Sequence, residues 1–117
     1  MSWDVSIVGE DGKTLTSPHV HTVTGGTYVH GGTNELWLNI TYNYHKHFDK
    51  VLGMSLTEAL HGKKVSETLP LLAEAIEKLQ PGPDADYWKA TEGNARLALE
   101  QLLSLAAWGL SGKWSVS

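Results

Sequence analysis

The sequence predicts an α+β domain in which three to four helices pack on one face of a small antiparallel sheet. Segments near both ends alternate apolar and polar residues with the two-residue period of a strand. The second half instead repeats its apolar residues with helical spacing. Because strands and helices are segregated along the chain, we expect an α+β fold rather than alternating βαβ units. The 117 residues have the length of one domain, so we expect a single domain over 1–117.

The first third of the chain is expected to supply most of the strands. Residues 3–8 alternate in the manner of a half-buried strand, and 10–13 form a turn in which Gly12 takes a positive φ. Residues 14–24 predict an edge strand, because Pro18 cannot donate a hydrogen bond to a ladder.

Two further segments complete the expected N-terminal strands. Residues 27–30 lie between two glycine pairs and predict a short strand or an ordered loop. Residues 35–42 have the clearest strand pattern, in which alternate residues face opposite sides of the sheet. One side is expected to carry Leu36, Leu38 and Ile40, and the other Trp37, Asn39 and Thr41.

From Asn43 the period becomes helical. Tyr44, Phe48, Val51 and Leu52 form one apolar stripe, which predicts a helix that ends near Gly53. The next residues, Ser-Leu-Thr-Glu at 55–58, have the form of a capping box and predict a short helix closed by Gly62.

Two longer helices and a final strand follow. The third helix is expected to begin near Ser66 or Thr68, with Pro70 in its first turn, and to stop at the Gln-Pro-Gly-Pro-Asp of 80–84. Thr91 predicts the N-cap of a fourth helix that runs to about Trp108. The alternation around Trp114 and Val116 predicts a strand at the C-terminus.

Composition narrows the classes of function. The net charge is −4, and acidic residues interleave with the lysines, whereas proteins that grip a phosphate backbone show a contiguous basic face. We therefore expect no general nucleic-acid binding. The sequence has no cysteine, no signal-like start and no apolar run near the ~20 residues of a membrane span, so we expect a cytoplasmic protein without membrane contact.

A polar-ligand site is predicted at the junction of strand and helix. Residues 39–44 place asparagines and tyrosines together, and these side chains offer donors and acceptors without a charge. Aromatic residues stack on bases, while asparagine amides read their edges. We expect the ligand to be small and polar, a nucleotide being the leading case. The predicted ligand-binding residues are Trp37, Asn39, Tyr42, Asn43, His47, Trp88, Thr91 and Asn94.

Catalysis has less support in the sequence. It contains no Gly-x-Ser-x-Gly elbow and no cysteine nucleophile, so we expect a non-catalytic protein without a cofactor. The alternative is a metal-dependent hydrolase. His19 and His21 on a strand would point to the same side, and His30 or Glu35 would be a third ligand. Another alternative is a protein-interaction module that uses exposed tryptophans. We also expect a homo-oligomer, because terminal strands can leave open sheet edges.

Three short patterns carry a resemblance. They are Asn-Ile-Thr-Tyr-Asn-Tyr at 39–44, Leu-His-Gly-Lys-Lys at 60–64 and Tyr-Trp-Lys-Ala-Thr-Glu-Gly-Asn-Ala at 87–95. With these patterns the chain, from about 35 to 116, resembles a family of short uncharacterised phage and bacterial proteins. The resemblance implies a small phage accessory protein that works in the host cytoplasm. Proteins of that kind include anti-defence sponges, which sequester the nucleotide signals of host immunity.

Overall fold

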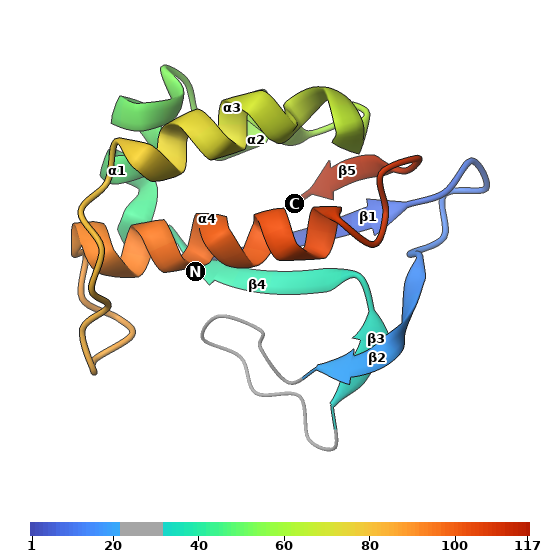
Figure 1. Cartoon of the computed structure of the whole chain (residues 1–117), viewed down its shortest axis with the longest axis horizontal. Coiled ribbons are helices and arrows are strands. Elements are labelled where there is room, and N and C mark those ends of the chain that lie inside the picture. The colour runs from blue at the N-terminus through green and yellow to red at the C-terminus, as the bar shows by residue number, and fades with distance from the viewer. Residues whose placement is uncertain (22–31) are drawn as a thin grey trace.

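A three-stranded antiparallel sheet lies at the centre of the computed structural model, which describes residues 1–21 and 32–117 (Figure 1). Its strand order is β4-β1-β5, formed by Trp37–Thr41, Ser2–Val8 and Lys113–Val116. The first strand therefore pairs with a strand from the middle of the chain and with the last one. The predicted α+β class, with N-terminal and C-terminal strands in an antiparallel sheet, is confirmed.

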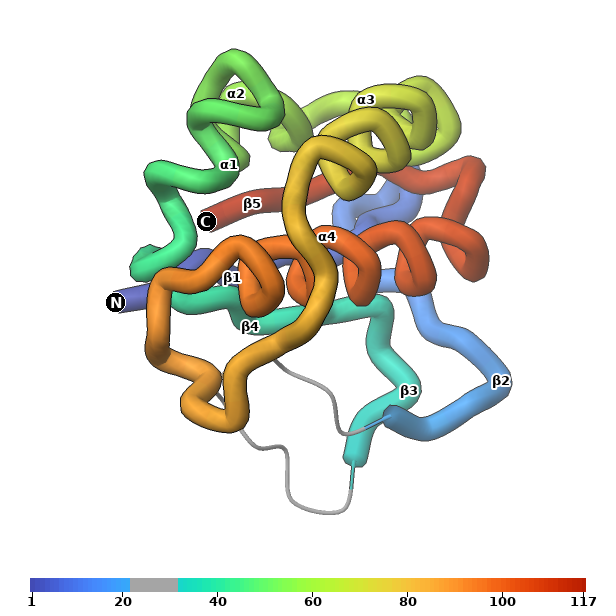
Figure 2. The backbone as a smooth tube through the Cα atoms, turned by 60° about the vertical axis from the view of Figure 1, so that its left-hand side comes forward, coloured from blue at the N-terminus to red at the C-terminus, as the bar shows by residue number. Residues whose placement is uncertain are grey.

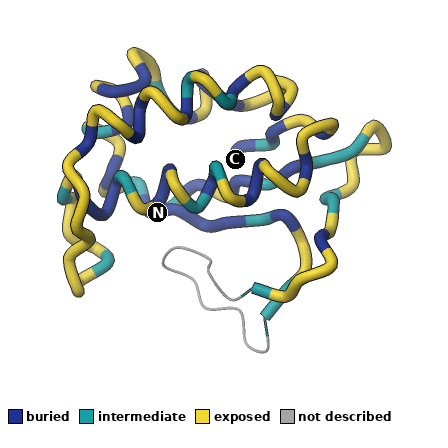
Figure 3. The backbone as a smooth tube through the Cα atoms, in the orientation of Figure 1, coloured by how far each residue is buried: buried dark blue, intermediate teal, exposed yellow. Residues whose placement is uncertain are grey.

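One face of this sheet is apolar and carries the helices. In the register, Val5 lies opposite Leu38 on one side and Val116 on the other, and all three side chains are buried. The helices are α1 (His45–Leu52), α2 (Leu56–Leu60), α3 (Val65–Glu77) and α4 (Glu92–Ala106), with a 3₁₀ turn η1 at Tyr42–Tyr44. Figure 3 shows the buried sides of α3 and α4 and the buried strands around a common core.

The strands β2 (Thr16–His21) and β3 (Thr33–Glu35) form a separate two-stranded antiparallel sheet (Figure 1). We call this sheet the arm. The single strand expected over 35–42 is divided at Leu36, whose N–H donates to the carbonyl of Leu15 at 2.8 Å while its own carbonyl accepts from Ile7 at 2.9 Å. The backbone of Leu36 is thus shared between Leu15 and Ile7, and at this residue the chain leaves the main sheet for the arm. The predicted segment 27–30, and the end of 14–24, lie outside the described residues.

Local capping signals place α1, α2 and α4 as expected. Gly53 ends α1 with a left-handed φ of 74°. Ser55 and Glu58 form the predicted capping box of α2, and the side chain of Thr91 caps α4 by accepting from the N–H of Asn94.

Helix α3 begins earlier than its sequence suggests. Val65 and Ser66 donate their N–H groups to the carbonyls of Gly112 and Leu110, at 2.9 and 3.3 Å. These partners satisfy amides that a helix N-terminus would otherwise leave free. The extra residues place Pro70 inside α3 rather than in its first turn, which corrects the sequence prediction.

The outer edge of β5 is covered by the connection between α2 and α3. The backbone N–H of Trp114 donates to the carbonyl of Lys63 at 3.0 Å, and its backbone carbonyl accepts from the N–H of Gly62 at 2.9 Å. Val116 donates to Nδ1 of His61 at 3.0 Å. At this edge the open ladder that led us to expect a homo-oligomer is therefore closed. Among the helices that the structure describes, none is both long and apolar enough to cross a membrane.

Candidate functional site

The structure places Trp37 and Asn39 on the face of the sheet opposite the helices. Asp4 Oδ1 accepts from Trp37 Nε1 at 3.3 Å and from Asn39 Nδ2 at 3.0 Å. Asn39 Nδ2 also lies 2.8 Å from Ser2 Oγ, and the residue is only 6% exposed. Its amide donor is therefore occupied by the neighbouring strand.

Asn94 organises the connection between α3 and α4, which descends beside the start of α4 in Figure 1 and crosses in front of α4 in Figure 2. Its Oδ1 accepts from the N–H of Asp84 at 2.8 Å, and its Nδ2 donates to the carbonyls of Asp86 and Lys89 at 3.0 and 2.9 Å. The side chain is almost fully buried. A single primary amide thus satisfies backbone groups along most of the connection.

Two side chains from η1 and α1 hold the same connection from the other side. Asn43 Nδ2 donates to the carbonyl of Trp88 at 2.8 Å, and Nε2 of His47 lies 2.9 Å from the carbonyl of Ala90. A carbonyl oxygen can only accept, so Nε2 is the ring nitrogen of His47 that carries the hydrogen in this contact. The Trp88 ring packs edge-on against the ring of Tyr87, with centroids 5.0 Å apart.

The predicted ligand-binding residues therefore lie in three places. Five of them surround the connection between α3 and α4: Asn43, His47, Trp88, Thr91 and Asn94. Trp37 and Asn39 lie with Asp4 on the outer sheet face, and Tyr42 packs edge-on against Trp3 with ring centroids 4.7 Å apart. Most of their hydrogen-bonding groups already have partners within the chain, so these side chains have a structural role in the fold. A ligand role for them stays a prediction.

Tyr44, which is fully buried, and Tyr87, which belongs to the connection and is partly buried, are joined at this point. The Tyr44 hydroxyl donates to the carbonyl of Tyr87, and the Tyr87 hydroxyl accepts from the N–H of Thr41 at 2.9 Å. Burial raises the pKa of Tyr44 well above its ordinary value, with a further contribution from Tyr87. Burial also raises the pKa of Tyr87. In both cases the low-dielectric surroundings disfavour the phenolate.

This pair predicts a loss of stability in alkaline solution. A folded-state pKa above the unfolded value means that the stabilisation is complete below about pH 10 and is lost as the pH rises through the raised value. We expect the free energy of unfolding, measured in urea, to fall less between about pH 9 and about pH 11 in Tyr44→Phe than in the wild type. Equal falls in the two proteins would contradict it. Phe48→Leu, which removes no ionisable group, is the control and should follow the wild type.

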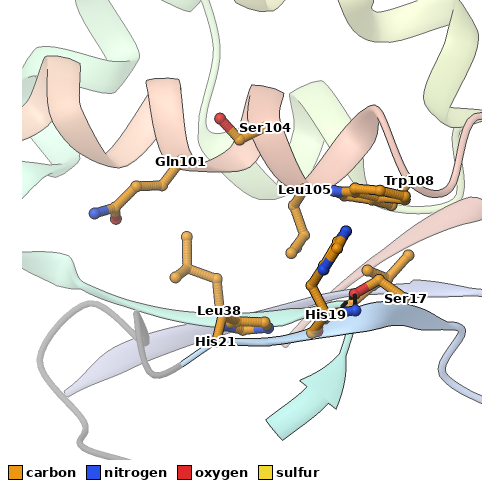
Figure 4. A pocket seen from close by; sticks show the side chains of 9 residues that line it. Ser17, His19, His21, Leu38, Gln101, Ser104, Leu105 and Trp108 are labelled. Atoms are coloured by element: carbon orange, nitrogen blue, oxygen red, sulfur yellow. Dashed lines mark hydrogen bonds between the residues drawn. The ribbon is translucent and has the colours of Figure 1, made fainter. Parts of the chain in front are cut away.

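A cleft of about 290 Å³ lies between α4, the first strand of the arm and β4 (Figure 4). Its apolar lining comes from Leu36 and Leu38 of the sheet side and Leu105 of α4. Leu38 and Leu105 point toward each other across it, and Trp108 closes one end (Figure 4). The three leucines are buried, whereas Trp108 is 51% exposed and leaves much of its ring surface open.

Polar side chains surround this apolar lining. Gln101 and Ser104 come from α4, and Ser17, His19 and His21 come from β2. The His19 ring meets the Trp108 ring edge-on, with centroids 5.1 Å apart and planes at 68°. Ser17 Oγ donates to the backbone carbonyl of His19 at 2.8 Å. The hydroxyl is thus not directed at an imidazole that would activate it as a nucleophile.

The two strand histidines of the metal hypothesis both line the cleft, as their alternate positions predicted. Nε2 of His21 lies 2.8 Å from the carbonyl of Glu35, so this nitrogen is engaged within the arm. His30 lies outside the described residues. In the ranges 1–21 and 32–117, no three histidine, aspartate or glutamate side chains come close enough to hold a metal ion.

The sequence reasoning missed most of this cleft, although a signal for it was present. Leu97, Gln101 and Ser104 in α4 and Trp108 just beyond its end recur at helical spacing, on a different side from the core residues Leu99 and Leu102. Apolar residues at both ends of a second stripe indicate a helix that contacts more than one partner. The second partner, the arm, could not be identified from the spacing.

No protein-family model, curated protein or solved structure matches this chain.

Proposed function

We propose that the protein binds a small molecule without turnover, in the cleft between α4 and the arm. The observation that carries this proposal is the combination of a buried leucine lining with convergent polar side chains in about 290 Å³. Small-molecule sites commonly have this anatomy, an apolar cavity of ~300–1,000 Å³ with a few polar groups that fix orientation.

Binding without chemistry agrees with the arrangement of the cleft side chains. The Ser17 hydroxyl is bonded to a backbone carbonyl, and one nitrogen of His21 faces the carbonyl of Glu35. A general base must instead lie within hydrogen-bond reach of the group that it activates. The resemblance to phage and bacterial proteins supports a sequestering role in the cytoplasm. In that role the protein would hold a nucleotide-derived signal without converting it.

The proposal differs from the sequence prediction in where the ligand lies. Each location contains one exposed tryptophan, Trp108 at the cleft and Trp88 on the connection between α3 and α4, at 51% and 54% exposure. Replacing each with alanine therefore compares the two locations with matched changes. Neither residue belongs to the buried core, so both variants should fold.

The test is a thermal-shift screen of small aromatic and nucleotide-derived compounds against the wild type and the two variants. A ligand that is present at a hundredfold excess over its Kd stabilises the folded state by ~2.7 kcal/mol, which raises the melting temperature measurably. We expect Trp108→Ala to abolish the shift and Trp88→Ala to retain it. The reverse result would place the ligand at the sequence-predicted residues, and no shift with any compound would count against a small-molecule function.

A further inference from the structure

We infer that the cleft takes an uncharged planar heteroaromatic compound of nucleobase or nucleoside size and disfavours its phosphorylated forms. The inference rests on the proposed function, because it names the ligand class of that same cleft. It depends on three features of the cleft: its dimensions, the absence of lysine, arginine, aspartate and glutamate from the lining residues that the structure describes, and the position of its available polar groups.

The dimensions of the cleft suit one ring system. Its volume of about 290 Å³ is at the lower end of the range for small-molecule sites. Leu38 and Leu105 approach each other from opposite walls, which leaves a narrow space between α4 and β4 (Figure 4). Trp108 at one end is half-exposed and is met by His19 only at an angle of 68°. A flat ring can therefore contact the exposed surface of the indole, where stacking on a base is favourable.

Charge decides between a base and a phosphate. Among the described residues that line the cleft, none is lysine, arginine, aspartate or glutamate. The nearest charged pair along α4 is engaged elsewhere: Arg96 donates from Nη1 to the carbonyl of Leu79 at 2.8 Å and pairs through Nε with Glu100 at 3.5 Å. A phosphate in the cleft would lose hydration without meeting a lysine or arginine among the described lining residues. The two histidines of the lining are engaged by other groups: the His19 ring packs against Trp108, and Nε2 of His21 faces the carbonyl of Glu35. Burying an uncompensated charge is costly.

The polar groups that remain available match the edge of a heterocycle. Gln101 hangs at the end of the cleft away from Trp108 (Figure 4), and no hydrogen bond joins its amide to another described residue. A primary amide presents one acceptor and two donors, so it can pair with adjacent acceptor and donor groups on a base. The ring would lie between the leucines, with one end at Trp108 and its polar edge at Gln101.

The test is a calorimetric titration with two matched series, adenine, adenosine and AMP, and uracil, uridine and UMP. For at least one series, we expect the base and the nucleoside to bind with similar Kd values and the monophosphate to bind about tenfold more weakly. Gln101→Met keeps the length of the side chain but removes its amide, and should weaken base binding about tenfold. Gln80→Met is the matched control, because Gln80 is exposed on the connection after α3 and should leave the Kd unchanged.

The outcomes separate the ligand class from the proposed function. If a monophosphate binds more tightly than its nucleoside and Trp108→Ala abolishes that binding, the cleft is a ligand site but the uncharged class is wrong. Failure of both bases and both nucleosides to bind, while other compounds bind in a manner that depends on Trp108, would also overturn the class alone. Absence of any binding that depends on Trp108 would overturn both the class and the proposed function.

Discussion

Gly93→Ala is expected to destabilise the protein by about 3 kcal/mol or more, although alanine is the better helix former. Gly93 lies in the first turn of α4, where helix propensity alone predicts a gain of ~1 kcal/mol from the change. In the structure a Cβ at this position would lie 1.9 Å from the carbonyl oxygen of Gly82 and 2.4 Å from its carbonyl carbon. Both are backbone atoms, so the clash cannot be relieved by a rotamer change.

Urea unfolding followed by far-ultraviolet circular dichroism measures this effect. Gly53→Ala is the matched control, because a Cβ there meets nothing within 4 Å and only the positive φ of 74° is strained. That strain should cost about 1–2 kcal/mol. A Gly93→Ala variant as stable as the wild type would show that the connection between α3 and α4 does not press against the helix.

Asn94→Ala is expected to cost about 3 kcal/mol and to open the connection between α3 and α4. The substitution leaves the N–H of Asp84 and the carbonyls of Asp86 and Lys89 without their partner. Each buried polar group that loses its hydrogen bond costs about 1–3 kcal/mol, reduced where water can reach it. Because these groups span the connection, their loss should release the segment as a unit.

One measurement and one control variant distinguish this opening from a general loss of stability. Limited proteolysis should cleave within 80–91 faster in Asn94→Ala, at urea concentrations far below the unfolding midpoint. The control is Asn43→Ala, which removes one exposed hydrogen bond to the carbonyl of Trp88 and should cost about 1 kcal/mol. Equal effects of the two substitutions would mean that Asn94 is no more than one contact among several.

Much of the fold could be predicted because its signals are local. The alternation of β1, the left-handed glycine after α1 and the capping box of α2 each involve residues within a few positions of one another. Their geometry follows from backbone sterics and from satisfying the first amides of a helix. Predictions failed where distant chain segments supply the partner. The carbonyls of Gly112 and Leu110 accept from the first amides of α3, so the helix begins earlier than expected. The hydrogen bond from Leu36 to the carbonyl of Leu15 divides the expected strand.

The candidate site shows the same division. Sequence reasoning correctly placed His19 and His21 on one side of a strand, because that follows from the two-residue period. It could not place Leu38, Leu105 and Trp108 around one cleft, since α4 and the arm are brought together only by the packing of the whole domain.

The sequence by itself determined the class of the fold, the caps of α1, α2 and α4 and which side of β1 and β5 is buried. Only the tertiary structure decided which polar side chains are already occupied. Asn39 bonds to Asp4 across 35 positions, and Asn43 bonds to Trp88 across 45. Before folding, each of these amides is as available to a ligand as the amide of Gln101. The physical reason is that a hydrogen-bonding group is satisfied by whatever lies near it in space, and periodicity carries no information about a partner so far along the chain.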